Sequence, residues 1–338
     1  MNLITFVESR YSTYNIMLTQ QLKKLALVGA FCMVGATATA QQDAQYSQYM
    51  YSPLYLNPAA AGGDGKNIEF GITHRQQWLG YTASFDQGGS PVSFMGFASV
   101  PLRFLHGGVG LVVQNDRLGP INNFSMVMSY AFREEVRNGY VSAGIQAGIY
   151  SMGLDFSMLR FREQGDILEG KGNQTQMRPD FGIGIQLTKK KYHLGFSINH
   201  VLRPTFSFAG AADAARLNYH GNIMGGVNFD INEDIAVRPS ALVRTDFKTF
   251  SAQASLIGSY QERFHVGVGL RNSFNVDDAI AFIGFNPTKS LHVGYSFDYV
   301  VSGVAAKAPT SHELILRYSI PVPMPVLPPI IRTPRFRK

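Results

Sequence analysis

The feature that most constrains this chain is an alternation of apolar side chains with small or polar ones, which recurs between about residue 67 and residue 320. From Val141 to Ile149, for example, every odd position is Val, Ala or Ile, and every even position is Ser, Gly or Gln. Successive side chains of a β-strand point to opposite faces, so this pattern predicts strands with one apolar face. No stretch beyond residue 40 keeps a helical period, and an all-β chain is therefore expected.

The alternating stretches predict about 14 strands that are long enough to cross a membrane. They are expected near residues 67–77, 91–102, 107–116, 122–133, 139–151, 178–188, 191–201, 216–230, 234–245, 249–260, 263–273, 278–286, 290–301 and 311–320. Soluble strands are shorter, about five or six residues on average. The face opposite the apolar one is rich in Gly, Ser and Gln, and its charges include Glu69, Arg75, Arg238, Arg244, Arg271 and Asp298. A transmembrane antiparallel β-barrel with a polar lumen is therefore favoured over a soluble sandwich or propeller.

The connectors between the expected strands alternate in length. Gaps after odd-numbered strands tend to be long, as at 78–90 and 202–215, and gaps after even-numbered strands are short. Outer-membrane barrels have short periplasmic turns and longer external loops, so both ends of the barrel region, residues 67–320, are expected on the periplasmic side. The longest external loop would run from Ser151 to Met177, where its charged residues would either bind a partner or simply be solvated.

The front of the chain, residues 1–40, is expected to be a signal peptide for export to the outer membrane. Lys23 and Lys24 precede an apolar run from Leu25 to Gly35, which is too short to span a bilayer, and a small-residue site ends at Ala40. A buried helix of a cytosolic domain is the less favoured alternative. The single cysteine, Cys32, lies inside this segment, so the mature chain has no thiol for a disulfide or a metal site.

The mature chain then opens with an uncharged, tyrosine-rich segment, QYSQYMYSPLYLNPAAAG, at residues 45–62. Pro53 and Pro58 would keep it from extending the sheet, because proline lacks an N–H donor. Residues 41–66 are expected to start on the periplasmic side and to form either a plug inside the barrel or an ordered strap across its mouth. The side chains expected to be buried in either case are those of Tyr49, Tyr55 and Asn57.

The tail, residues 321–338, is rich in proline and ends in four basic residues, Arg332, Arg335, Arg337 and Lys338. Proline at this density favours polyproline II, so the tail is expected to hang into the periplasm. It would be either a docking peptide for a periplasmic partner or a frayed end. Because these four residues supply most of the net charge of +7, the barrel is nearly neutral and nothing indicates nucleic-acid binding.

No group of residues predicts an enzyme, a cofactor or a metal site. The eight histidines are scattered without a metal-ligand spacing such as HExxH, and there is no G-x-S-x-G nucleophile elbow. His292 and Asp298 share an inward face but would lie about 20 Å apart along one strand, too far for a catalytic dyad. A barrel hydrolase, which would need a serine and a histidine side by side at the rim, is the least favoured alternative.

Eight short motifs follow one another along nearly the whole mature chain. They are the opening segment at 45–62, HRQQW at 74–78, GLVVQNDRLG at 110–119, PDFGIG at 179–184, LGFSINH at 194–200, RPS at 238–240, GYSFDY at 294–299 and SHEL at 311–314. Their order resembles the PorP/SprF family of type IX secretion and gliding-motility membrane proteins of Bacteroidetes. The proline-rich basic tail has no family-wide equivalent and departs from this pattern.

The resemblance implies an outer-membrane barrel without catalytic activity that serves the type IX system. Such a barrel acts either with core ring and motor components or as the dedicated partner of secreted proteins with a type-B C-terminal signal, such as gliding adhesins. Secretion components, cargo and outer-membrane lipid are the implied partners. The residues nominated for plug or lumen binding are Tyr49, Tyr55, Asn57, Pro58, Arg75, Trp78, Asn115, Asp116, Asp180, Arg238 and Asp298.

A second, fainter resemblance leaves an alternative function open. Asn57-Pro58-Ala59, just before the first strand, resembles an element that ends the N-terminal hatch of fatty-acid transporter barrels, which also have about fourteen strands. A transporter of small apolar molecules is therefore the rival expectation. A continuous path through the lumen would favour it, and a lumen packed with side chains would count against it.

Overall fold

The computed structural model describes residues 43–81, 89–159, 172–208, 215–273, 276–302 and 308–322. All of them belong to one compact unit, residues 40–338. The signal peptide expected over residues 1–40 and the basic end of the tail lie outside the described residues. Within the described ranges, no helix is long and apolar enough to cross a membrane.

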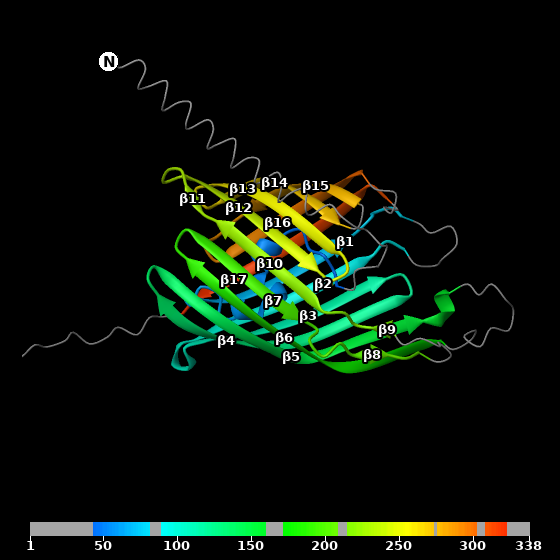
Figure 1. The fold of residues 1–338 in the computed structure, drawn as a ribbon. Coiled ribbons are helices and arrows are strands. Elements are labelled where there is room, and N and C mark those ends of the chain that lie inside the picture. The colour runs from blue at the N-terminus through cyan, green and yellow to red at the C-terminus, as the bar shows by residue number, and fades with distance from the viewer. Residues whose placement is uncertain are drawn as a thin grey trace, which may run out of the picture. The chain divides into compact units, whose positions relative to one another are not determined.

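The strands form a closed antiparallel barrel, in which β1 pairs with both β2 and β17 (Figure 1). The fourteen barrel strands are β1 (Asn67–Gln76), β2 (Val92–Leu102), β3 (Gly107–Leu118), β4 (Ile121–Val136), β5 (Gly139–Asp155), β6 (Asn173–Lys189), β7 (Tyr192–Asn199), β10 (His220–Val227), β12 (Ile235–Thr245), β13 (Phe250–Tyr260), β14 (Phe264–Ser273), β15 (Val276–Phe285), β16 (Leu291–Ser302) and β17 (Thr310–Pro321). Closure leaves no open sheet edge to face lipid. The barrel predicted from the alternation is confirmed.

One expected strand, at residues 216–230, is shorter than predicted because its two ends belong to other elements. β11 (Phe229–Asp230) pairs with β12. β9 (Ala215–Arg216) pairs with β8 (Thr205–Phe206) in a separate hairpin at the end of the barrel that carries the longer connectors, the loop end (Figure 1). Phe206 and Leu217 are buried there in one apolar cluster with Tyr150 and Phe156. Leu217, just before His220, is therefore buried within the loop region and does not face lipid.

The loop expected from Ser151 to Met177 is also shorter than predicted. β5 continues to Asp155 and β6 begins at Asn173, and these two residues still pair across the sheet. The alternation weakens in this region because the strands extend beyond the apolar band, where neither face has to be apolar. The charged centre of the loop, residues 160–171, lies outside the described residues.

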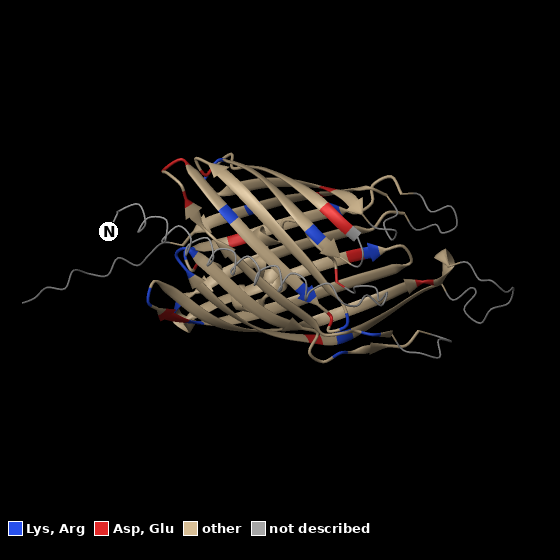
Figure 2. Cartoon of the chain, turned by 45° about the horizontal axis from the view of Figure 1, so that its top comes forward, with Lys and Arg blue, Asp and Glu red and all other residues tan. Residues whose placement is uncertain are grey.

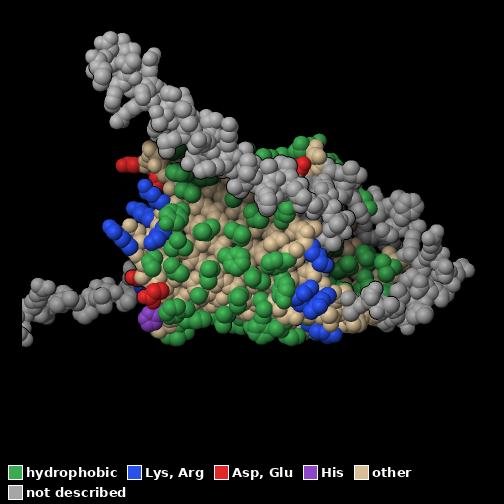
Figure 3. Space-filling model, in the orientation of Figure 1, with side chains coloured by type: hydrophobic (Ala, Val, Ile, Leu, Met, Phe, Trp, Pro, Cys, Tyr) green, Lys and Arg blue, Asp and Glu red, His purple; other side chains and the backbone are tan. Residues whose placement is uncertain are grey.

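The two faces of the wall carry apolar and polar side chains as predicted. On β5, Ile145 is 62% exposed on the outer face, whereas Ser142 and Gln146 point into the lumen and are buried. Most of the strand length is free of charged residues (Figure 2). The visible outer surface between the strand ends is covered mainly by hydrophobic and uncharged side chains, with the charged ones toward the two ends (Figure 3). This band is typical of the lipid-facing surface of an outer-membrane barrel.

Residues 43–66, the luminal segment, run through the inside of the barrel (blue in Figure 1). They contain three short turns, η1 (Tyr49–Tyr51), α2 (Pro53–Leu56) and η2 (Pro58–Ala60). The last two turns begin at proline, where the missing N–H has no partner to lose. Leu54 lies in one apolar cluster with Met95 and Val112 of the wall. The segment therefore occupies the lumen and does not lie across its mouth.

The luminal segment begins at the loop end of the barrel, so the expected start on the periplasmic side is wrong. Asp43 contacts His200 and His220, which lie where β7 and β10 meet their long connecting loop. At the other end, Gly62 lies against Gly108, beside the short turn between β2 and β3. The reason is geometric. β1 starts at the end with the short turns, so a segment that runs once through the lumen just before β1 starts at the opposite end.

Candidate functional site

A buried group of charged side chains, the luminal charge cluster, surrounds the first half of the luminal segment. Its members come from inward-facing positions on five strands that are neighbours in the barrel, β14, β15, β16, β17 and β1. Because alternate residues of neighbouring strands face the same side, these positions form one patch. The members are Arg271, Asp278, Asp298, Glu313 and Arg75, and all five are buried.

Ser47 lies at the centre of this cluster. Its hydroxyl donates to Asp298 Oδ2 at 2.6 Å and accepts from Nη1 of Arg75 at 2.8 Å and of Arg271 at 2.9 Å. Glu313 accepts from the backbone N–H of Ser47 at 2.7 Å and of Gln48 at 2.9 Å. Both backbone N–H groups and the Ser47 hydroxyl therefore have partners on the wall, as buried polar groups require.

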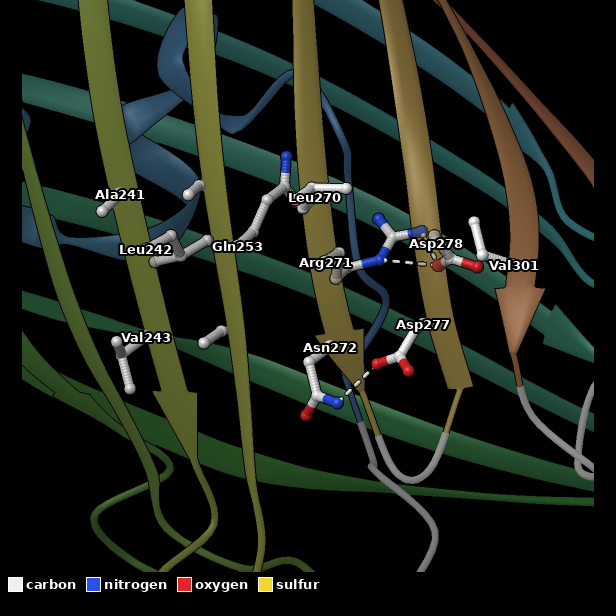
Figure 4. Close-up of a pocket in the computed structure, with 12 residues that line it drawn as sticks. Ala241, Leu242, Val243, Gln253, Leu270, Arg271, Asn272, Asp277, Asp278 and Val301 are labelled. Carbon is white, nitrogen blue, oxygen red and sulfur yellow. Dashed lines mark hydrogen bonds and ion pairs between the residues drawn. The ribbon is translucent and has the colours of Figure 1, made fainter. Parts of the chain in front are cut away.

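The cluster combines two guanidinium groups with three carboxylates. Arg75 pairs with Asp298 at 2.7 Å and with Glu313 at 3.2 Å, and Arg271 pairs with Asp298 at 2.8 Å. Figure 4 shows the remaining pair, between Arg271 and Asp278 at 2.6 Å. Charges persist away from water only when they are paired and hydrogen-bonded. The cluster and the segment therefore depend on each other, because the Ser47 hydroxyl accepts a hydrogen bond from each of the two arginines.

The outer side of the same stretch of wall is hollowed. A cavity of about 410 Å³ is lined by Ala252 and Ala254 of β13 and by the larger Val243 and Leu270 on the strands to either side (Figure 4). These residues occupy outward-facing positions, opposite in parity to the buried Arg271. The hollow is therefore an apolar surface that faces the membrane.

Glycines on the inward face form a groove for the second half of the luminal segment. A methyl group at Gly144 would come within 2.3 Å of Ala59 N, and one at Gly108 within 2.2 Å of Gly62 Cα. Real Cβ atoms do not approach backbone so closely, so only glycine permits this contact. Ser142 Oγ donates to Ala59 O at 2.8 Å beside the groove. The inward glycines thus serve the close approach of another backbone.

The start of the luminal segment is held by histidines. Asp43 Oδ2 lies 2.6 Å from His220 Nδ1 and 3.1 Å from His200 Nε2, and His200 Nδ1 lies 3.0 Å from Asp180 Oδ2. Burial alone would lower the pKa of His200, but the Asp43 and Asp180 carboxylates raise it to about 10. Burial opposes the ionisation of Asp43, yet His220 and His200 hold its pKa well below its usual range.

Several residues nominated from the sequence lie in or against the luminal segment. Tyr49, Asn57 and Pro58 are buried and Tyr55 is partly buried. The Tyr49 hydroxyl donates to Ser240 Oγ at 3.0 Å and that of Tyr55 to Ala44 O at 2.8 Å. Burial raises the pKa of both tyrosines, so both remain protonated donors. The nominated wall residues that face the lumen are Arg75, Asp116, Asp180 and Asp298.

Three other nominated residues lie elsewhere. Asn115 faces outward, because it is one position from the inward-facing Asp116, and its Nδ2 donates to Asn122. Its nomination as a lumen residue is wrong. Arg238 has a side chain that is 38% exposed and lies 3.9 Å from Glu262, near the periplasmic turns. Trp78 follows β1 with a left-handed φ of 53°, and its backbone N–H donates to Ser311 Oγ at 3.1 Å.

Sequence reasoning nominates neither the centre of the charge cluster nor the histidine group. In the sequence Ser47 resembles any other serine, because the charged side chains around it are brought together only by the fold. His200 and His220 did carry a usable signal, because they flank one long loop between strands that are neighbours in an antiparallel barrel. In the described part of the chain, the histidine side chains with recorded hydrogen bonds pair with Asp, Asn or Tyr, and none pairs with a serine.

The fold and this interior define a class of protein: an outer-membrane β-barrel whose lumen holds the N-terminal segment of its own chain. Residues 38–318 match the family model for the type IX secretion system membrane protein PorP/SprF. The chain belongs to this family and is therefore an outer-membrane component of type IX secretion. The resemblance seen in the ordered motifs is confirmed.

Solved structures share the fold at low sequence identity. The Ralstonia pickettii toluene transporter TbuX is 10% identical over 80% of this chain and 93% of its own, with a TM-score of 0.50. A Pseudomonas aeruginosa FadL homologue is 14% identical over 80% of this chain and 93% of its own, with a TM-score of 0.44. At such identities the likeness concerns the fold alone. No curated protein matches the chain in sequence.

Proposed function

We propose that this chain works in the type IX system by binding other proteins, and that it neither transports small molecules nor catalyses a reaction. It would support the export or surface attachment of secreted proteins that carry a type-B C-terminal signal, such as adhesins. Support for this proposal comes from the filled lumen. The luminal segment is fastened by buried charges around Ser47 and by close backbone contact at Gly144. Cargo would therefore bind at the ends of the barrel and would not pass through it.

The two ends of the barrel would have different partners. The longer connectors, such as the one between β7 and β10, lie at the loop end, where the apolar core under the β8–β9 hairpin supports a defined surface for cargo. The periplasmic turns and the tail, residues 321–338, would contact ring or motor components. The basic tail residues suited to an acidic partner are Arg332, Arg335, Arg337 and Lys338. The hollow over Ala252 and Ala254 would contact outer-membrane lipid.

Transport of small apolar molecules is less well supported. The likeness to the toluene transporter TbuX concerns the fold alone, at 10% identity. A transporter needs a path through the barrel, whereas the lumen here holds Tyr46, Leu54 and Ala61 packed against the wall. In this arrangement the inward glycines accommodate the luminal segment and do not line a channel.

Deletion of the gene, followed by mass spectrometry of the surface proteins, tests the proposal. We expect the deletion to remove one or more type IX cargo proteins from the cell surface, and expression of the wild-type chain to restore them. Outer-membrane proteins that do not use type IX secretion should keep their abundance, which serves as the control. Unchanged surface display of every type IX substrate would sink the proposal.

A further inference from the structure

We propose that Asp43, His200 and His220 form a binding site for a divalent transition metal of the zinc class, at the loop end of the lumen. The bound ion would fasten the start of the luminal segment to the barrel wall. This inference is independent of the proposed secretion role, because it concerns how the luminal segment is held in the barrel and not which proteins the barrel binds. It also departs from the expectation, drawn from the sequence, of a chain without a metal site.

The three donor atoms already lie close together. One carboxylate oxygen of Asp43, Nε2 of His200 and Nδ1 of His220 lie within 4.8 Å of one another. A tetrahedral zinc ion with bonds of about 2.0–2.1 Å needs its ligand atoms about 3.3 Å apart. The Asp43 oxygen lies 2.6 Å from one histidine and 3.1 Å from the other, so these two distances need small outward shifts, and the two histidine nitrogens, at most 4.8 Å apart, would adjust to about 3.3 Å.

The surroundings of His200 are those of a metal-binding histidine. Its Nδ1 lies 3.0 Å from Oδ2 of Asp180, a carboxylate that is only 1% exposed. Histidines that bind metal usually donate their second ring nitrogen to a carboxylate, which fixes the tautomer and the ring orientation. Asp180 therefore turns Nε2 of His200 toward Asp43. The ring of Tyr150 packs edge-on against the imidazole at 5.5 Å and limits its rotation.

Two further observations point to a ligand. His220 is only 3% exposed and its Nε2 has no hydrogen-bond partner among the described residues, so Nδ1, the proposed ligand atom, makes the ring's one hydrogen bond there, to Asp43. Beside Asp43 lies a cavity of about 10 Å³, lined by polar side chains that include Gln114, Asp116 and Asn123. This is about the space of one water, and of the three proposed ligands it adjoins Asp43 alone, so it shows room for solvent beside the carboxylate.

The three ligands come from separate parts of the fold. Asp43 starts the luminal segment, His200 follows β7, and His220 begins β10. The expected cleavage after Ala40 would leave Asp43 close to the mature N-terminus. A metal ion would therefore tie that end of the chain to both sides of the long loop between β7 and β10.

Titration of the full mature chain with Co²⁺ tests the site. The protein is purified in detergent without a polyhistidine tag and freed of metal by chelation. We expect one Co²⁺ per chain, with visible absorption bands of tetrahedral Co²⁺ that an equivalent of Zn²⁺ abolishes. Asp43→Asn and His220→Ala should abolish the bands, and Asp180→Asn should weaken binding by about 10–100-fold.

The matched control uses another buried histidine pair, His265 and His292, whose rings are 5.2 Å apart. His265→Ala should leave Co²⁺ binding unchanged. Heat-modifiable migration in gels reports whether each variant folds, and if His220→Ala does not fold, the near-isosteric Asp43→Asn decides. Absence of one-to-one binding at micromolar Co²⁺, or binding that survives Asp43→Asn, would overturn the site and leave the contacts of Asp43 with His200 and His220 as ion pairs without a metal.

Discussion

At the scale of residues, Glu313 is the strongest single link between the wall and the luminal segment. It accepts the backbone N–H groups of Ser47 and Gln48 and pairs with Arg75. Its loss would leave a guanidinium group and two N–H donors short of partners in a buried site. A buried charge without its partner costs more than the intact pair contributes, so this position should be sensitive to substitution.

We expect Glu313→Ala to lower the free energy of unfolding by about 3–5 kcal/mol, the usual cost of breaking a buried ion pair. Urea unfolding from lipid vesicles can be followed through Trp78, the single tryptophan. As a control, Glu262→Ala removes a carboxylate that is 85% exposed and 3.9 Å from Arg238, and should change the free energy by about 0–1 kcal/mol. Equal losses in the two variants would contradict the role of the cluster.

At the scale of elements, the barrel wall and the luminal segment fit because glycine occupies the contact positions. Gly144 on β5 and Gly108 on β3 both meet backbone of the segment at distances that exclude a Cβ atom. Glycine weakens a strand because it adds entropy to the unfolded chain and no side chain to pack. Its presence on the inward face is explained by the segment that lies against it.

Gly144→Ala should therefore displace the luminal segment, because the new methyl group would come within 2.3 Å of Ala59 N. We expect chymotrypsin, which cuts after aromatic residues, to cleave the variant within residues 45–62 while the wild-type chain resists. Gly96→Ala is the matched control, since the nearest atoms to its methyl group would be 3.9 Å away. Resistance of Gly144→Ala equal to that of Gly96→Ala would show that the groove is not needed.

The sequence predicts the strands better than it predicts what lies inside the barrel that they form. Alternation depends only on neighbours within one strand, so Ser142 and Ile145 can be assigned to opposite faces without a structure. The same rule excludes Asn115 from the lumen, where motif membership had placed it. The contact between Asp43 and His200 joins positions 157 apart and depends on the path of the luminal segment, so no local pattern could reveal it.

At the scale of the whole molecule, the sheet is closed into a barrel, and the lumen of that barrel is occupied by the luminal segment. Pairing of β1 with β17 closes the sheet, and the luminal segment, which runs from Asp43 at the loop end to Gly62 near the periplasmic end, fills the interior. In the described part of the chain, side chains of the segment such as Leu54 and Leu56 pack against the inner face of the wall. Its family membership makes this barrel an outer-membrane component of type IX secretion.

Planar-bilayer recording of the purified mature chain tests this central claim most directly. If the luminal segment fills the barrel, the wild-type chain should show no steady ion conductance, and deletion of residues 43–62 should open a stable pore. Insertion of both chains is checked by the same heat-modifiable migration, so that a silent bilayer reflects a closed barrel. A steady conductance in the wild-type chain that the deletion leaves unchanged would contradict the account.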